Sequence, residues 1–233
     1  MKKFFLILLW AVFSVHNFSL YSQQKYDFVA EAGMDAAVYR GPEAVKYPFR
    51  YEGTPYAYTE SFLSGTLVYN GVFYKGLLLN FNAHRDELHL KMPSSGIVIE
   101  LDRRIVGEFS FGGRSYVSLI GERAVDGLQE GFYQMLYKGE DMLVKKNGKS
   151  FHERLQNGGS SKGAFRFFDP ADRYYVVKDG VPVQISKVKH FTKVYKDKKK
   201  AVKGFIRKNK IKFIDMDDND LALVEVMEFV DNN

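Results

Sequence analysis

Apolar and polar residues alternate along several short segments of the chain between residues 64 and 186. Leu77, Leu79 and Phe81, for example, are separated by single residues such as the polar Asn80. A period of two with one apolar face is typical of antiparallel strands that are buried on one side. We therefore predict an antiparallel β-meander domain over residues 64–186.

Three dipeptides between these segments are typical of tight hairpin turns: Asn70-Gly71, Gly112-Gly113 and Asp179-Gly180. A type I′ turn needs positive φ at both central residues, and Gly, Asn and Asp tolerate that conformation best. Sequential strands joined by short turns usually lie side by side, and a long meander of twisted strands tends to coil. The predicted fold class is α+β, mainly β: a curved antiparallel β-meander that forms an open roll or half-barrel.

The apolar period changes from two to three or four after Ile185, which indicates helices. We expect two or three short C-terminal helices over residues 187–233, packed on an open face or edge of the sheet. Their predicted apolar positions are Val188, Phe191, Val194 or Tyr195, Val202, Phe205, Ile206, Leu221, Val224, Met227 or Glu228, and Val230.

The start of the chain has the pattern of a secretory signal peptide. Lys2 and Lys3 precede an apolar stretch over residues 4–13, and polar and small residues follow. We predict a signal peptide over residues 1–22; the alternative is an uncleaved membrane anchor. Residues 23–63 contain several Gly and Pro breaks, so we expect an extended lead-in that packs on the sheet.

The chain has no cysteine, which excludes disulfides and thiolate metal ligands. An exported chain without disulfides indicates a bacterial envelope protein whose domain is stable through its own core. We expect it in the periplasm or outside the cell, at the surface of a Gram-negative bacterium, with no transmembrane segment once the signal peptide is removed.

Positive charge is concentrated in one segment. Residues 187–212 hold twelve Lys or Arg and one acidic residue, whereas the formal net charge of the whole chain is +6. Without Lys2 and Lys3 the net charge is +4, so the rest of the exported chain carries −7 against the +11 of this segment. The alternatives are an anion-binding face, a merely solvated helix face, or intramolecular complementarity to the acidic remainder.

As an anion-binding face, the segment would bind an anionic lipid, an acidic glycan or an acidic envelope protein. Export argues against nucleic acid as the partner. The candidate anion-binding residues are Lys198, Lys199, Lys200, Lys203, Arg207, Lys208 and Lys210.

Known chemical motifs are present only in part. Gly148-Lys149-Ser150 ends like a phosphate-binding loop, but Leu143 stands where the first glycine is needed. The stretch from Asp215 begins like a calcium loop and lacks Gly at its sixth position and Glu at its twelfth. His84 and His89 lie around a turn without the spacing of a helical zinc site. We therefore predict no catalytic residue, no cofactor and no metal.

Several strings resemble an uncharacterised family of exported, β-rich proteins of Gram-negative bacteria. The resemblance implies export and a β-rich fold, and it transfers no site residue. The strings are Gly65 to Gly71, Asn80-Phe81-Asn82, Asp86-Glu87-Leu88, Tyr174 to Gly180, and Phe205 to Lys210.

The leading functional hypothesis is a non-enzymatic envelope protein that binds an apolar or anionic ligand, a lipid, peptide or glycan, on the curved sheet. One alternative is a hydrolase that acts on envelope polymers, which would need convergent carboxylates or His in a cleft. The other is a purely structural or interaction protein.

Overall fold

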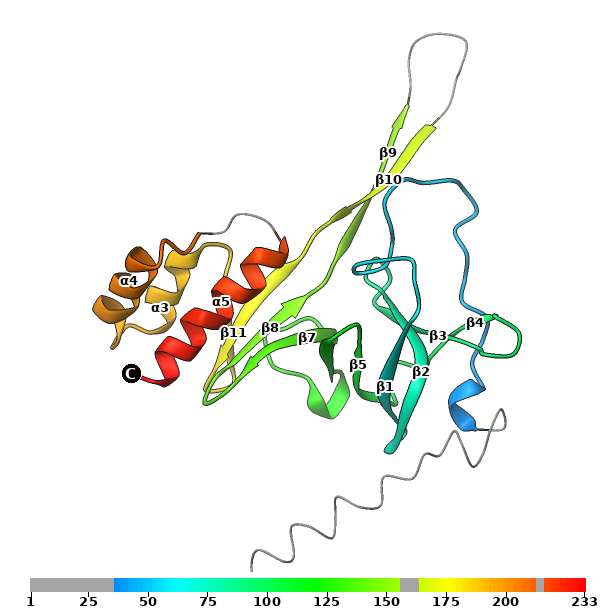
Figure 1. Ribbon diagram of the computed structural model, residues 1–233, viewed down its shortest axis with the longest axis horizontal. Coiled ribbons are helices and arrows are strands. Elements are labelled where there is room, and N and C mark those ends of the chain that lie inside the picture. The colour runs from blue at the N-terminus through cyan, green and yellow to red at the C-terminus, as the bar shows by residue number, and fades with distance from the viewer. Residues whose placement is uncertain (1–35, 156–163, 213–215) are drawn as a thin grey trace, which may run out of the picture. The chain divides into compact units, whose positions relative to one another are not determined.

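The computed structural model describes residues 36–155, 164–212 and 216–233 (Figure 1). Its main element is a ten-stranded antiparallel sheet with the strand order β12-β11-β8-β7-β6-β5-β1-β2-β3-β4. The edge strands β12 and β4 do not pair, so the sheet stays open, and the predicted fold class is confirmed. The strands are β1 (Leu63–Tyr69), β2 (Val72–Asn82), β3 (Glu87–Lys91), β4 (Val98–Glu100), β5 (Val106–Phe111), β6 (Arg114–Leu119), β7 (Gly131–Lys138), β8 (Met142–Lys146), β9 (Lys149–Leu155), β10 (Ala164–Pro170), β11 (Arg173–Lys178) and β12 (Val181–Gln184).

All three predicted hairpin turns are present. Asn70-Gly71 connects β1 to β2, Gly112-Gly113 connects β5 to β6, and Asp179-Gly180 connects β11 to β12. Both residues of each pair have positive φ, between 50° and 76°, as a type I′ turn requires.

The strand order departs from a simple meander at one point. After β4 the chain returns and places β5 against the free edge of β1, so that Gly65 lies opposite Phe111. A bulge at Gly65/Thr66 interrupts the pairing of β1 with β2. Strand β1 is therefore a central strand with partners on both sides.

The sheet curves until side chains of distant strands meet. Phe81 of β2 and Phe132 of β7 lie four strand intervals apart, which is ~19 Å in a flat sheet at about 4.8 Å per interval. Their ring centroids are only 5.9 Å apart. Phe109 stacks on Tyr116 between them, with ring centroids 4.7 Å apart. All four side chains are buried, so the interior of the curved sheet is filled by its own aromatic rings.

The described part of the lead-in follows the sheet as extended chain. It contains one short 3-10 helix, η2 (Ala37–Tyr39). Isolated bridges then join Glu43 to Ile99 of β4, Glu52 to Phe167 of β10, and Tyr56 to Asn82 of β2. The lead-in thus adds backbone hydrogen bonds to three separate strands. The predicted signal peptide and its cleavage site lie outside the described residues.

Strands β9 and β10 form a separate two-stranded hairpin between β8 and β11. The backbone N–H of Ala171 donates to the carbonyl of Gly148, 2.9 Å away, and closes the base of the hairpin. Residues 156–163, between β9 and β10, lie outside the described residues.

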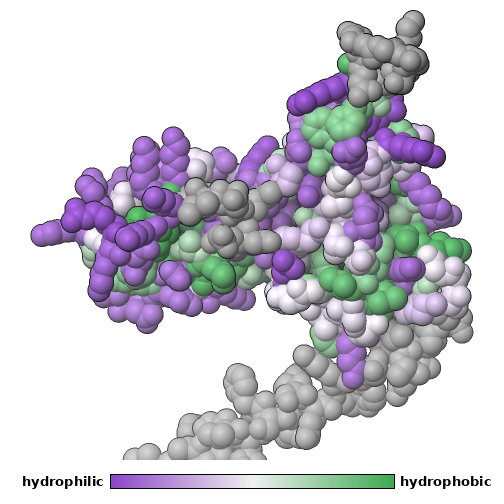
Figure 2. All heavy atoms as spheres, turned by 45° about the horizontal axis from the view of Figure 1, so that its top comes forward, coloured by the Kyte–Doolittle hydropathy of each residue, from purple (hydrophilic) through white to green (hydrophobic). Residues whose placement is uncertain are grey.

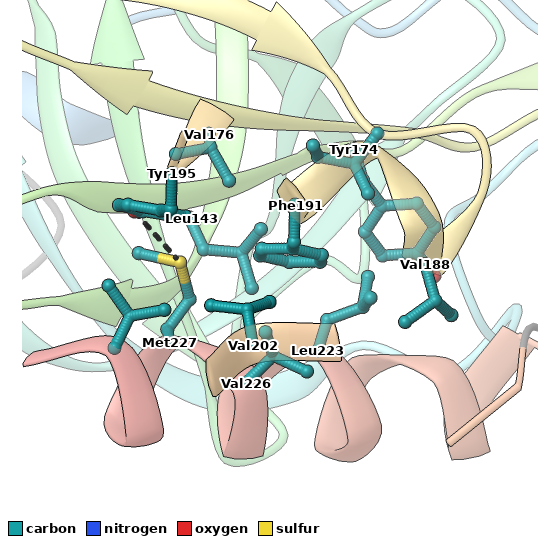
Figure 3. Packing of buried hydrophobic residues seen from close by; sticks show 12 residues of the cluster. Leu143, Tyr174, Val176, Val188, Phe191, Tyr195, Val202, Leu223, Val226 and Met227 are labelled. Atoms are coloured by element: carbon teal, nitrogen blue, oxygen red, sulfur yellow. Dashed lines mark hydrogen bonds between the residues drawn. The ribbon is translucent and has the colours of Figure 1, made fainter. Parts of the chain in front are cut away.

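Three α-helices follow the last strand: α3 (Phe191–Val194), α4 (Lys199–Lys208) and α5 (Met216–Asp231). A 3-10 turn, η4 (Val188–His190), precedes them. The apolar cluster between the helices and strands β8 and β11 contains Leu143, Val176, Phe191, Val202 and Val226 (Figure 3).

The buried face of α5 matches the predicted one only in part. Leu221 was expected on that face and is 70% exposed. Met227 and Val230 are buried as predicted, and Leu223 and Val226 are buried as well. Figure 3 shows Leu223, Val226 and Met227 pointing toward the strands that α5 covers.

Candidate functional site

A groove beside α4 brings together part of the predicted anion-binding residues. Its volume is about 630 Å³. We call it the basic groove and define it by its lining residues: Asp197, Lys198, Lys200, Ala201, Gly204, Phe205 and Lys208 from the α4 region, and Phe229 from α5.

The floor of the basic groove is apolar. The rings of Phe205 and Phe229 stack with centroids 4.3 Å apart and planes inclined by 15°. Ala201 and Gly204 lie about one turn apart on α4, and because alanine has only a methyl group and glycine has no side chain, both leave the floor open. A Cβ at Gly204 would meet no atom within 4 Å. An apolar chain can therefore lie against these residues without moving them.

Two parallel rows of cations run along α4. Lys200 and Lys208 lie two turns apart on the row that lines the groove. Lys199, Lys203 and Arg207 are spaced by four, so they form a neighbouring row. All five side chains are exposed. In Figure 2 hydrophilic side chains surround a smaller hydrophobic area on the helical part at the left.

Two other predicted residues have different surroundings. The ammonium of Lys198 donates to the carbonyl of Val230, 2.8 Å away, at the C-terminal end of α5. A cation is favourable there because the helix dipole leaves partial negative charge on the last carbonyls. Lys210 follows the end of α4 with φ of 53° and is exposed. Lys198 thus has a structural contact, whereas Lys210 extends the cationic surface.

Within the described part of the chain the cations of α4 form no ion pair, although Asp197 also lines the basic groove. None of the ion pairs there includes Lys199, Lys200, Lys203, Arg207 or Lys208. The alternative that the basic segment is complementary to the acidic remainder of the chain is therefore not supported by direct ion pairs of these α4 residues. The positive charge of this surface remains available to an external anion.

A buried charge cluster holds α5 against the sheet. Lys145 of β8 is fully buried, and its Nζ lies 3.1 Å from a carboxylate oxygen of Asp172 and 3.1 Å from both carboxylate oxygens of Asp220 on α5. The phenol of Tyr174 donates to Asp220 over 2.8 Å. Tyr58 of the lead-in lies 3.4 Å from the same ammonium. One cation thus joins the lead-in, the sheet and the last helix.

The electrostatics of the cluster follow from burial and from these contacts. Burial lowers the pKa of Lys145, but Asp172, Tyr58 and Asp220 raise it by more, so the net shift is upward. Burial also raises the pKa of the Asp220 carboxyl, against the opposing attraction of Lys145. Because Lys145 contacts both oxygens of Asp220, we assign the charged form to the pair.

Sequence reasoning missed this cluster. Lys145 lies two residues after Leu143, so the alternation places a lysine on an apolar face. A lysine on an apolar strand face indicates a buried partner of opposite charge, because a lysine is almost never fully buried unless it is paired. Its partners Asp172 and Asp220 are remote in sequence, so only the fold could identify them.

The other residues and partial motifs noted in the sequence make contacts within the fold or lie outside the described residues. His84 Nδ1 lies 2.8 Å from the hydroxyl of Tyr47, and His89 lies 3.0 Å from a carboxylate oxygen of Glu87. Among the described residues no group of three or more His, Asp or Glu is arranged to hold a metal ion. Ser150 of the partial phosphate-loop motif pairs with Asp169 within the β9–β10 hairpin. Asp215, where the partial calcium loop begins, lies outside the described residues.

In the described parts of the chain no helix has both the length and the apolar character to cross a membrane. Comparison of the chain with protein-family models, curated proteins and solved structures gave no match. A function for the chain therefore has to be inferred from the geometry of its own residues, above all from the basic groove.

Proposed function

We propose that the chain is an exported, non-enzymatic protein of the bacterial envelope that binds anionic lipid through the basic groove. The observation that carries this proposal is the combination of an apolar floor, Phe205 against Phe229, with exposed lysines along its rim. A free phosphate needs only the cations, whereas an anionic lipid uses both parts of the surface.

The energetics favour contact with a lipid surface. Each Lys or Arg near an anionic membrane contributes about 1 kcal/mol. Lys199, Lys200, Lys203, Arg207 and Lys208 lie on one ten-residue helix, so they can approach such a surface together. Apolar area that leaves water adds roughly 25 cal/mol per Å², and the stacked rings at the groove floor offer that area.

The basic groove also replaces the interior of the curved sheet as the proposed ligand site. Phe81, Phe109, Tyr116 and Phe132 fill that interior. The cations of α4 are instead exposed to solvent, and Figure 2 shows hydrophilic residues over much of the helical part.

Vesicle flotation tests the proposal. We expect the protein to float with vesicles of phosphatidylglycerol and phosphatidylcholine at about 20 mM salt, and to be released at about 500 mM salt as the charges are screened. The double variant Lys200→Glu/Lys208→Glu should weaken binding at least about tenfold. The matched control Lys91→Glu/Lys138→Glu makes the same charge change at two exposed strand lysines and should bind nearly as the wild type does.

Two results would contradict the proposal. One is equal binding to vesicles of phosphatidylcholine alone, because the cations would then contribute nothing. The other is an equal loss of binding in both double variants, because net charge and not the basic groove would then determine affinity. Phe205→Ala, with folding checked by circular dichroism, separates lipid contact from simple anion binding: it should weaken vesicle binding and leave the binding of inorganic phosphate unchanged.

A further inference from the structure

A second cavity lies beneath the lead-in and has a different chemical character. Its volume is about 230 Å³, which suits a small ionic group better than a drug-sized ligand. We call it the tyrosine pocket. Its polar and aromatic lining comes from Lys46, Tyr47, Tyr51, Tyr56, Glu60, Asn82 and His89.

The aromatic walls of the tyrosine pocket are held in place. The rings of Tyr47 and Tyr51 meet edge to face, with centroids 5.6 Å apart and an interplanar angle of 76°. The Tyr56 ring packs edge-on against His89 with centroids 5.7 Å apart, and its hydroxyl lies 3.2 Å from His89 Nδ1. The other ring nitrogen of His89 lies 3.0 Å from Glu87. The pocket is thus formed before any ligand arrives.

Charges of both signs lie around the tyrosine pocket: the carboxylate of Glu60 and the cations of Lys46 and Arg85. Glu60 is exposed at its edge, and among the described residues no hydrogen bond or ion pair uses its carboxylate. Lys46, the lysine at the edge, is already paired with Glu43 over 2.9 Å. Burial raises the pKa of both Tyr51 and Tyr56, and the Glu60 carboxylate raises each of them further. Glu60 therefore acts on two of the three phenols.

Aromatic rings beside a free carboxylate attract organic cations. The negative face of a ring binds an ammonium or guanidinium group, and aromatic cages for quaternary ammonium ions use this interaction. The chain itself shows the effect, since the guanidinium carbon of Arg85 lies 4.7 Å from the centroid of the Tyr47 ring. From this combination of cavity, rings and charge we propose that the tyrosine pocket binds a substituted ammonium group, with Glu60 as its counter-ion.

A pair of matched probes tests this inference directly. Choline and 3,3-dimethyl-1-butanol have almost the same form, but only choline carries a positive charge. We expect choline to bind in isothermal titration calorimetry and to shift the NMR signals of Tyr47, Tyr51 and Tyr56. The neutral alcohol should bind at least about fivefold more weakly, because it loses the attraction to the rings and to Glu60.

Substitutions locate the binding site. Glu60→Gln removes the charge, and Tyr51→Leu removes one ring; each should weaken choline binding about threefold or more. Glu122→Gln is the matched control, because Glu122 is an exposed acid outside the pocket, and it should leave the affinity unchanged. Since Glu60 is at the surface, its variant keeps the inference testable even if Tyr51→Leu fails to fold.

Three outcomes would overturn the inference: equal binding of the two probes, equal affinity of Glu60→Gln and the wild type, or choline shifts that map to other residues. None of them bears on lipid binding through the basic groove, which shares no residue with this pocket.

Discussion

The ammonium of Lys145 lies 3.1 Å from each carboxylate oxygen of Asp220, and this contact joins strand β8 to helix α5 inside the protein. It connects the sheet to the helical part that carries the basic groove. The same ammonium contacts Asp172, which precedes β11. The position of the groove therefore depends on a buried charge cluster and on apolar packing together.

Replacing Lys145 should destabilise the protein strongly. Lys145→Met keeps much of the side-chain volume but leaves Asp172 and Asp220 without their cation. Removing one partner of a buried ion pair costs about 3–5 kcal/mol in the free energy of unfolding, which urea denaturation measures. Lys146→Met is the neighbouring control; its Nζ contacts Asp86 from the other face of the strand, and that site is partly exposed. A loss below about 1 kcal/mol for Lys145→Met would show that the cluster does not stabilise the fold.

Stability should fall in alkaline solution. Burial raises the pKa of Tyr133 to about 12, and the hydrogen bond to Asp231 raises the pKa of Tyr137 to about 12. An unfolded tyrosine loses its proton near pH 10, so between pH 10 and 12 the folded chain holds protons that the unfolded chain has lost. Rising pH then favours unfolding, and the contribution of both groups is fully present only below pH 10.

Urea denaturation at a series of pH values measures this effect. The double variant Tyr133→Phe/Tyr137→Phe should show a smaller decrease of the free energy of unfolding above pH 10 than the wild type does. An unchanged slope would mean that other groups cause the alkaline loss. Lys145 is one such group, because its raised pKa acts in the same direction.

Two glycines should respond in opposite ways to substitution by alanine. A Cβ at Gly65 would collide with the carbonyl oxygen of Ser110 on the neighbouring strand, so Gly65→Ala should destabilise by about 1–3 kcal/mol. Gly204 lies within α4 with open space around it, so Gly204→Ala should stabilise by about 0.5–1 kcal/mol. Thermal unfolding of both variants checks the signs, and destabilisation by Gly204→Ala would contradict the open geometry at that site.

The aromatic interior should tolerate truncation poorly. Phe132→Ala removes a ring that touches both Phe81 and Phe109, and such a change typically costs about 3–5 kcal/mol. Phe165 on the β9–β10 hairpin is 37% exposed, so Phe165→Ala should cost much less. Chemical denaturation of the two variants compares them; equal losses would show that the curved sheet does not derive its stability from this interior.

Local patterns explain why much of the sheet could be predicted. A turn such as Asn70-Gly71 is determined by the φ preferences of its own two residues, and alternation identifies the strands beside it. The pairing of β5 with β1 could not be found in this way, because Gly65 and Phe111 are far apart in the sequence. The face of α5 was predicted only in part, since Leu221 and Leu223 fit a helical period almost equally well.

The two proposed sites also differ in how much of each could be predicted from the sequence. The lysines of the basic groove are close in sequence, so their concentration was visible before the fold was known, although the partner ring Phe229 was not. Tyr47, Tyr51 and Tyr56 lie within the predicted lead-in. Their meeting with Glu60 and His89 depends on how the lead-in crosses the sheet.

The double pairing of β1 has a consequence for the folding pathway. Strands β1 to β4 form one set of neighbouring strands and β5 to β8 form another. Among the described strands, the β1–β5 ladder is the backbone pairing that joins the two sets. Local hairpins close within microseconds, whereas pairing of strands remote in sequence is slower because more chain entropy is lost before contacts form. The docking of β5 onto β1 is therefore expected to be the slow event, and Gly65, opposite Phe111, lies in the ladder that forms in that step.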